Sequence, residues 1–215
     1  MEGFFVAQQS HSNYAKTILS VPSTLNMDYV DTFAPGLDDS KFWWLMEPFI
    51  DHSEVRTLLK SQGYQTVSFS TNWSLTDMNS ADIHLAAFPV ELTDFEQYLL
   101  QTTPLRLSQP FLQDSASVFT SETQRRTILH TLGALDDFVS DPDPVFVFAH
   151  ILLPHPPFVL DAEGKPVQSA TDFSFKDAED FEGSSEEYRK GYKGQVEFLN
   201  SRLQEILTTI LQQSN

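Results

Sequence analysis

An apolar run that ends in two histidines and a cluster of prolines occupies residues 146–158, Phe146-Val-Phe-Ala-His-Ile-Leu-Leu-Pro-His-Pro-Pro-Phe158. From Val145 to Ile151 only His150 is polar, which predicts a central strand covered on both faces. The prolines fix φ and lack a backbone donor, so a rigid turn containing His155 must follow. Ligands of open α/β sheets bind at the carboxyl ends of strands, so both histidines are candidate site residues. The alternative is a core His150 bonded to the backbone and a structural His155.

Helical and strand patterns alternate along the chain. Val55, Leu58 and Leu59 have helical spacing before Gly63, a natural helix terminator, and residues 64–71 then alternate like a strand. A short strand is also expected at residues 3–7. This alternation predicts an α/β sandwich with a largely parallel central sheet flanked by helices.

Two capping-box patterns predict further helices. Ser121 with Gln124 precedes a helix that runs to Val139 and leads into the histidine strand, and Ser184 with Glu187 precedes a long final helix. One face of the final helix is predicted to hold Tyr192, Val196, Leu199, Leu203, Ile206 and Ile210. The acidic segment from residue 161 to residue 183 is predicted to be a surface excursion.

Length and composition limit the classes of function. The 215 residues fit a single domain covering 1–215. The net charge is −17 and the 13 Lys and Arg residues are scattered, so nucleic acid is not an expected partner. The lack of cysteine excludes disulfides, thiolate zinc sites and a cysteine nucleophile. No apolar run approaches the ~20 residues that span a bilayer, so the chain as given is expected to be soluble.

Both ends of the chain have the pattern of an interrupted domain. The amphipathic helix before Asn215 normally leads into another strand, and the strand predicted near Gly3 has no partner before it. We therefore expect an internal piece of a larger domain, incomplete at both ends. The alternative is a complete domain that ends in an amphipathic helix.

A second candidate site is the hydroxyl-rich stretch of residues 10–27. Ser and Thr favour helix caps over helix interiors, so the stretch fits a helix N-terminus with Thr17 or Ser20 as the cap. Free backbone N–H groups and the helix dipole there suit a phosphate or sulfate ester. Pro22 favours the later start, since proline is tolerated in the first helical turn. A Ser/Thr-rich cap without chemistry is the alternative.

Together, residues 3–7, Ser12-Asn-Tyr-Ala-Lys-Thr-Ile-Leu-Ser20, Ser23-Thr-Leu-Asn-Met27 and Phe148 to Phe158 resemble the sulfatase-like members of the alkaline phosphatase superfamily. The resemblance is especially close to membrane-associated bacterial proteins related to phosphoethanolamine transferases and lipoteichoic acid synthases. It implies an alkaline phosphatase-like sandwich. It also implies an extracytoplasmic domain on a bacterial membrane, with a tether that this chain does not contain.

In the family, a threonine that often follows lysine begins a helix, ligates a divalent metal and attacks phosphorus. Lys16-Thr17 matches that position, so the resemblance implies Thr17 as nucleophile and as ligand of Zn, Mn, Mg or Ca. Ser20-Val-Pro-Ser23 is similar to the motif of true sulfatases, but Thr24 stands where arginine is expected, so Ser20 stays the alternative. His150 and His155 would bind oxygens of the transferred group or a second metal.

Most of the implied metal ligands are missing from this chain. The family has an aspartate in its first strand and an Asp-His pair after a late strand, and neither precedes Gly3 nor follows Asn215. Asp82-Ile-His84 is not at a position to replace them and is interpreted as part of a strand edge. This chain alone is therefore expected to carry only part of the site and to be inactive by itself.

The expected function is hydrolysis or transfer of a sulfate or phosphate ester through a phospho-threonine intermediate, and a lipid- or glycan-linked ester is one candidate substrate. A divalent cation would lower the pKa of the attacking alcohol. The alternative belongs to another class, a non-catalytic or degenerate α/β binding module whose acidic, aromatic-rich surface contacts protein or glycan. Trp43, Trp44 and Trp73 are candidates for that surface, although clustered tryptophans also occur in cores.

Overall fold

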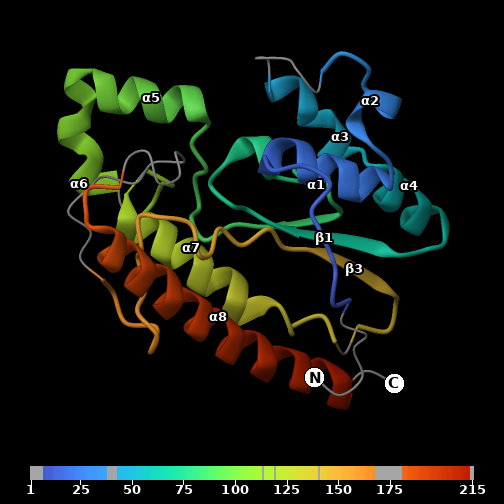
Figure 1. The fold of residues 1–215 in the computed structure, drawn as a ribbon. Helices are drawn as coiled ribbons and strands as arrows, with labels where there is room; N and C mark the ends of the chain where they lie inside the picture. The colour runs from blue at the N-terminus through green and yellow to red at the C-terminus, as the bar shows by residue number, and fades with distance from the viewer. Residues whose placement is uncertain are drawn as a thin grey trace.

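The computed structural model describes residues 7–37, 43–112, 114–118, 120–139, 141–167 and 181–213. The predicted strand at residues 3–7 and much of the predicted excursion at 161–183 lie outside these ranges. The elements in chain order are α1 (Thr17–Asn26), α2 (Val30–Phe33), η1 (Trp43–Met46), α3 (Pro48–Asp51), α4 (Glu54–Ser61), β1 (Gln65–Phe69), η2 (Ser74–Thr76), β2 (Ile83–Leu85), α5 (Asp94–Thr102), η3 (Pro104–Ser108), α6 (Gln109–Leu112), α7 (Ser121–Ala134), β3 (Val145–Phe148) and α8 (Ser185–Gln213). The fold is mixed α/β, with helices around a small open sheet (Figure 1).

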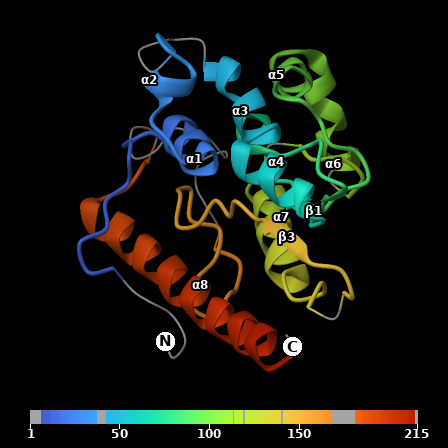
Figure 2. The same cartoon turned by 90° about the vertical axis from the view of Figure 1, so that its right-hand side faces the viewer.

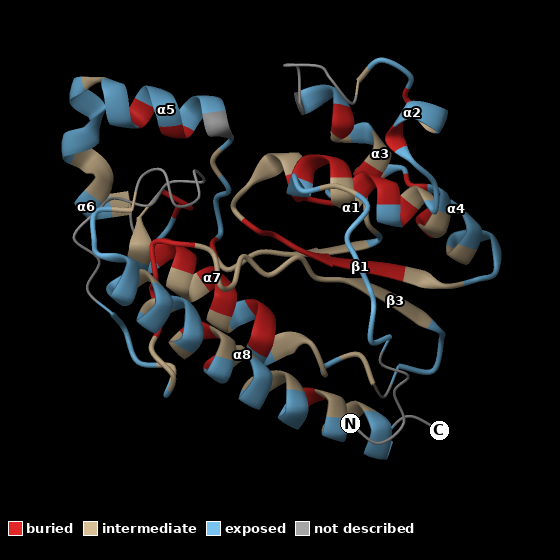
Figure 3. Ribbon diagram, in the orientation of Figure 1, coloured by how far each residue is buried: buried red, intermediate tan, exposed pale blue. Residues whose placement is uncertain are grey.

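The described sheet has three parallel strands in the order β2-β1-β3. Val67 of β1 lies opposite Ile83 of β2 and opposite Val147 of β3. The prediction of a parallel sheet is therefore confirmed. The prediction that the histidine strand is central is wrong for the described residues, because β1 lies in the middle and is buried along most of its length (Figure 3).

The apolar run that begins at Val145 predicted a longer, central strand, but only its first four residues pair with β1. All four residues of β3 are only partly buried. Further along the same run, Ile151 and Leu153 leave the sheet and pack against a core cluster built around α7 and α8. The hydrophobic run thus serves a strand first and an irregular packed segment afterwards.

Helices cover the two faces of the sheet. On one face, Leu25 of α1 belongs to a core cluster that packs against Phe146 and Phe148 of β3. On the other face, the ring of His130 in α7 lies edge-on to Phe69 of β1, with 6.5 Å between centroids. Figures 1 and 2 show α1 and α4 above the sheet and α7 and α8 below it. The lower core holds Ile128, Leu132, Val159, Leu160, Phe198 and Ile206.

The helix-to-strand unit at residues 53–69 forms as predicted. Ser53 caps α4 by accepting a hydrogen bond from the backbone N–H of Arg56. Gly63 follows the helix with φ +87°, a left-handed conformation that side chains resist, and β1 begins at Gln65.

Two predicted helix starts were tested by the structure. The capping box before α8 is confirmed. The carboxylate of Glu187 accepts a hydrogen bond from the backbone N–H of Ser184, and Ser184 Oγ accepts one from the backbone N–H of Glu187. The cap of α7 is Thr120 rather than Ser121, since Thr120 Oγ1 accepts the N–H of Thr123. This helix ends at Ala134, before the predicted Val139.

Helix α1 begins at Thr17, so the later start that Pro22 favoured is wrong, and the cap is Lys16 rather than Thr17 or Ser20. Pro22 stands in the sixth helical position, where its ring removes one backbone hydrogen bond. Nearby side chains compensate for local irregularity, since Thr24 Oγ1 donates to the carbonyl of Ser20 and Asn26 Nδ2 to that of Pro22. The proline is thus tolerated inside a ten-residue helix.

The face that α8 buries differs partly from the predicted one. Leu199, Leu203 and Ile210 pack on the lower core as expected, and Ile206 is fully part of it. Tyr192 is largely exposed instead. The deepest positions that the pattern missed are Gln195 and Phe198.

Replacing Gly191 of α8 by alanine is expected to destabilise the protein by about 1–2 kcal/mol, although alanine is the better helix former. A Cβ at Gly191 would overlap the ring of Phe158. Gly133 of α7 is the matched control, because a Cβ there meets no atom within 4 Å and Gly133→Ala should stabilise by up to about 1 kcal/mol. Urea unfolding of both variants tests this, and equal stability of the two would contradict the packing described here.

Within the described ranges, no helix is both long and apolar enough to cross a membrane. Helix α8 has the length, with 29 residues, but charged residues such as Glu197, Arg202 and Glu205 recur along it.

Candidate functional site

Thr17 is the first residue of α1 and its side chain is exposed. The next two residues, Ile18 and Leu19, are buried in a cluster against which Leu75 packs. Leu75 lies in η2, which follows the carboxyl end of β1. The start of α1 therefore lies on the carboxyl side of the parallel sheet, where α/β proteins bind ligands.

The other hydroxyls of the 10–27 stretch are engaged in structural contacts. Ser20 Oγ is hydrogen-bonded to Ser12 Oγ at 2.7 Å. Ser23 is fully buried, donates to the carbonyl of Asp28 at 2.6 Å and accepts from Asn13 Nδ2 at 2.8 Å. Ser23 thus fastens the loops on either side of α1.

His150 lies two residues beyond β3, at the carboxyl end of that strand as predicted. Its Nδ1 is buried and has no hydrogen-bond partner in the part of the chain that the structure describes. Burial lowers the pKa of His150 to about 4, so the imidazole is neutral at pH 7. An unpaired buried nitrogen is costly, and such atoms in native proteins call for an explanation.

His155 lies within the proline turn, which contains cis peptide bonds at Leu153-Pro154 and Pro156-Pro157. Its Nδ1 is in hydrogen-bond contact with the carbonyl of Pro156. The side chain is half-buried, so the other ring nitrogen is the one left for a ligand.

The structure does not join the predicted residues into one contact network. Among the described residues, no hydrogen bond or ion pair links Thr17 to His150 or to His155. Nor does the described part of the chain bring three or more His, Asp or Glu side chains together as a group able to hold a metal ion. The described residues therefore do not by themselves fit the divalent metal that the family resemblance implies.

Sequence reasoning missed a polar network at the β1 and β2 strands. His84 Nδ1 lies 2.8 Å from Ser68 Oγ, and its Nε2 lies 3.1 Å from Glu91 Oε2. Ser68 Oγ donates its own proton to the carbonyl of Met78 at 2.7 Å, so the ring N–H donates to Ser68. The hydrogen bond to Glu91, with the charges of Glu91, Asp77 and Asp51, raises the pKa of His84.

The chain of contacts from Ser68 through His84 to Glu91 has the residue types of a catalytic triad. It is not an accessible triad, however. Ser68 has no exposed surface, and its proton is held by a backbone carbonyl. The network instead ties β2 to β1. Its sequence signal is absent, because Ser68 and His84 meet only through the parallel register of the two strands.

Asp77 adds a buried carboxyl next to this network. Its Oδ1 accepts from the N–H of Thr71 at 2.8 Å and from Thr71 Oγ1 at 2.7 Å. Burial nevertheless outweighs these bonds and raises the pKa of Asp77 to about 6. Asp77, which lies just beyond the C-terminal end of β1, therefore changes its protonation state close to neutral pH.

Asp82 and His84 were interpreted as part of a strand edge, and this is confirmed because β2 is an edge strand of the described sheet. Asp82 accepts from Lys60 Nζ at 2.6 Å and from both the N–H and the hydroxyl of Thr66. The bonds to Lys60 and Thr66 hold the pKa of Asp82 well below its usual range. Asp82 therefore pins the edge strand and α4 to β1.

The tryptophans divide between surface and interior. Trp44 is 56% exposed, which fits the proposed aromatic surface, whereas Trp73 is half-buried. The side chain of Trp43 lies outside the described part of the chain.

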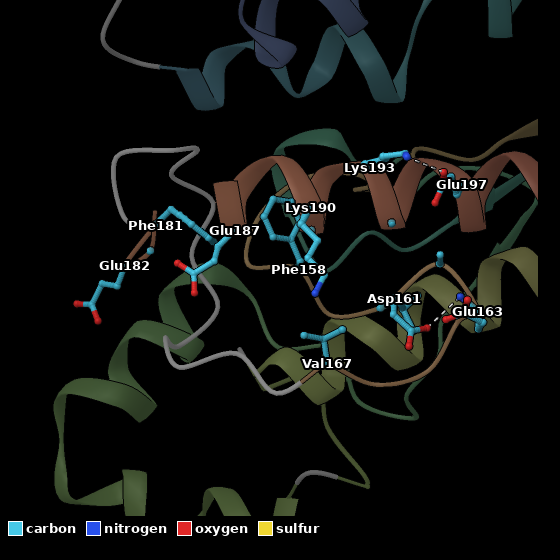
Figure 4. A pocket seen from close by; sticks show the side chains of 15 residues that line it. Phe158, Asp161, Glu163, Val167, Phe181, Glu182, Glu187, Lys190, Lys193 and Glu197 are labelled. Atoms are coloured by element: carbon cyan, nitrogen blue, oxygen red, sulfur yellow. Dashed lines mark hydrogen bonds and ion pairs between the residues drawn. The ribbon is translucent and has the colours of Figure 1, made fainter. Parts of the chain in front are cut away.

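A cavity of about 720 Å³ opens between α8 and the segment at residues 158–167 (Figure 4). Phe158 and Val167 supply apolar walls, and Glu163 and Glu187 are among the carboxylates at its rim. Its size is that of a small-molecule site. None of the predicted catalytic or substrate-binding residues lines it, although Phe158, which directly follows the proline turn, does.

Two buried groups should give opposite pH dependences of stability. The pKa of Asp77 is about 6 in the folded protein and 3.8 in the unfolded chain. As pH falls below about 6, the folded state therefore takes up a proton first, and this proton uptake stabilises the fold. As pH falls from 6.5 towards 4, the unfolded chain protonates His150 before the native state does, which destabilises the fold. The two contributions largely cancel in the wild type.

Single substitutions separate these contributions. Between pH 7 and about pH 4.5, Asp77→Asn should lose about 2 kcal/mol more stability than the wild type, and His150→Gln about 2 kcal/mol less. Urea unfolding at the two pH values measures both. If either variant had the wild-type pH dependence, the buried group concerned would not have the shifted pKa.

Comparisons of this chain with protein-family models, with curated proteins and with solved structures found no match.

Proposed function

We propose that this chain is part of a sulfatase-like enzyme of the alkaline phosphatase superfamily, which hydrolyses or transfers a sulfate or phosphate ester through Thr17. The observation that carries the proposal is the position of an exposed threonine at the first residue of α1, on the carboxyl side of a parallel sheet. The finer fold, an alkaline phosphatase-like sandwich, is part of the same proposal. The open three-stranded sheet is compatible with it.

The start of α1 has the electrostatics that an ester dianion or monoanion needs. The helix N-terminus carries partial positive charge from its backbone N–H groups. The first turn contains no acidic residue that would oppose an anion, and Lys16 precedes it. In the proposed reaction, Thr17 Oγ1 bonds to phosphorus or sulfur while the leaving alcohol departs with a proton. Water or an acceptor alcohol then displaces Thr17.

His150 is proposed to assist as a neutral hydrogen-bonding group. Its lowered pKa keeps it uncharged at pH 7, and its unpaired Nδ1 has no described protein partner. The second proposed contact is the ring nitrogen of His155 that does not face Pro156. Both histidines would orient oxygens of the transferred group.

The resemblance also implies a divalent metal and a membrane-tethered, extracytoplasmic enzyme. The described residues do not form a metal site. Its remaining ligands, the tether and a lipid- or glycan-linked substrate are proposals about the natural protein that carries this sequence.

An activity assay tests the proposed function. The natural protein should release the phenol from at least one of an aryl phosphodiester, an aryl phosphate or an aryl sulfate, in buffer with Mn²⁺ or Zn²⁺, and a chelator should reduce the rate. Protein that is folded by circular dichroism yet hydrolyses none of the three esters would contradict the proposal.

A non-catalytic binding module is the second candidate. The observation that favours it is the cavity between α8 and the 158–167 segment, which has apolar walls and the volume of a small-molecule site. A fluorescent apolar probe would bind this cavity, and Val167→Glu should weaken binding while the protein stays folded by circular dichroism. Binding that survives Val167→Glu would exclude the cavity as the binding site.

A further inference from the structure

A helical appendage leaves the sheet after β2 and returns before α7. It comprises α5, η3 and α6, and the main element contacts of α5 and α6 are with η3. Its two ends are held together at a neck, where Val90 and Ala116 form a parallel bridge. Val90 N–H donates to the carbonyl of Ser115, and Ser117 N–H donates to that of Val90. The appendage is therefore fixed to the body at its base and projects from it (Figure 1).

The appendage is folded by its own polar contacts. Thr93 and Glu96 form a reciprocal capping box at the start of α5. Thr103 Oγ1 donates to the carbonyl of Leu99 and also accepts from the N–H of Leu105, which joins α5 to η3. A preformed surface of this kind needs little ordering on binding.

Large apolar side chains cover the outside of this appendage. Their exposed fractions are 73% for Phe95, 67% for Tyr98, 41% for Leu99, 54% for Leu105, 74% for Leu107 and 84% for Phe111. We call these six residues the α5–α6 patch. Phe95, Tyr98 and Leu99 have the i, i+3, i+4 spacing of one helix face, opposite to the buried Gln97 and Leu100.

The apolar area that these six residues expose is large. The six residues together expose on the order of 700 Å², given that an aromatic side chain can bury about 150–250 Å². A stable interface buries about 800 Å² on each partner, so the patch has nearly the area that a dimer needs.

The patch is also the neutral part of a strongly acidic molecule. Residues 94–112, from the start of α5 to the end of α6, contain two acidic residues, Asp94 and Glu96, and one basic residue, Arg106, whereas the chain has 30 Asp and Glu against 13 Lys and Arg. Of these two acids, Glu96 is folded back onto Thr93 in the capping box. The surface thus adds almost no charge to an interface.

This charge pattern distinguishes the possible occupants. Helices that lie on lipid carry Lys and Arg on their polar face, and Arg106 is the one basic residue in the sequence of the appendage, residues 94–112. An unrelated partner steered by charge would be basic and would favour the acidic surface elsewhere. Two copies of a chain with net charge −17 repel each other, and this repulsion is weakest where the surfaces that meet are themselves nearly neutral. A second copy is the occupant that this pattern fits.

We propose that the α5–α6 patch is the interface of a homodimer related by a two-fold axis. In a two-fold interface the same patch faces itself, so the aromatic stripe of α5 packs on η3 and α6 of the second copy. Phe111 and Leu107, the two most exposed members, are the anchors. This inference is independent of the proposed enzymatic function.

Sedimentation velocity of the 215-residue protein over a micromolar concentration series tests the proposal. We expect a reversible dimer of twice 24.4 kDa, and we expect added salt to tighten it because salt screens the repulsion between two acidic copies. Phe111→Glu and Leu107→Glu should each weaken dimerisation at least about 30-fold. Both side chains are exposed in the monomer, so the variants should keep its fold by circular dichroism.

Leu211→Glu is the matched control, because Leu211 is also an exposed leucine but lies on α8, away from the patch residues in the sequence. Its exposed fraction is 54%. This variant should dimerise like the wild type. A monomer at every concentration, a dimer insensitive to Phe111→Glu, or equal weakening by Leu211→Glu would overturn the proposal. Binding of the monomer to phosphatidylcholine vesicles that Phe111→Glu removes would overturn it in favour of a lipid occupant.

Discussion

Replacing Thr17 by alanine is expected to lower turnover of an ester substrate by the natural protein at least about 10³-fold, without unfolding it. The hydroxyl is the proposed attacking group, and alanine leaves nothing in its place. The fold should persist because Thr17 is exposed and makes no capping hydrogen bond to α1. Steady-state rates with the best ester of the assay, together with thermal unfolding, give both quantities.

Two further variants control the Thr17 result. Thr17→Ser retains a hydroxyl and should keep part of the activity. Ser20→Ala removes the alternative nucleophile, whose Oγ bonds to Ser12, and should leave the rate within a few-fold of wild type. Undiminished turnover in Thr17→Ala would exclude Thr17, and loss of turnover only in Ser20→Ala would make Ser20 the nucleophile.

Replacing Arg56 by methionine is expected to lower the free energy of unfolding by about 3 kcal/mol. Arg56 is 7% exposed, and its Nη1 donates to the carbonyl of Asp51 at 2.7 Å and to Ser80 Oγ at 2.6 Å. Its Nη2 donates to the carbonyl of Ser80. Methionine fills similar space in the buried site of Arg56 but removes all three of these partly buried hydrogen bonds. The guanidinium thus joins α4 and α3 to the segment before β2.

The matched control is Arg202→Met on α8. The side chain of Arg202 is 40% exposed and pairs with Glu205 one turn along the helix. Exposed pairs of this kind contribute at most about 1 kcal/mol, so the variant should unfold close to wild type. Urea unfolding of both variants measures the difference, and a loss under 1 kcal/mol for Arg56→Met would contradict the role of Arg56 as a buried tie.

Local signals predicted the elements that are stabilised locally. Gly63 ended α4, and the pattern of residues 64–71 predicted β1, because a left-handed terminator and an alternating strand depend on few neighbours. Ser184 and Glu187 marked the start of α8 for the same reason. The parallel character of the sheet followed from the alternation of these elements.

Features that depend on distant residues were missed or misplaced. The run after Val145 predicted a central strand, yet Ile151 pairs with none of the described strands and packs on the α7 and α8 core instead. The network of Ser68 and His84 requires the register of β1 and β2, which no local pattern contains. The start of α1 at Thr17 was compatible with the family resemblance, while the propensity of Pro22 predicted a later start.

The covalent intermediate is the most direct test of the proposed function. The natural protein would be incubated with its best aryl ester, quenched in acid, digested and mapped by mass spectrometry. The account predicts a phosphoryl or sulfuryl group on the peptide that contains Thr17, absent from Thr17→Ala. Turnover with no modified Thr17 at any time point, or with the group on Ser20, would contradict it.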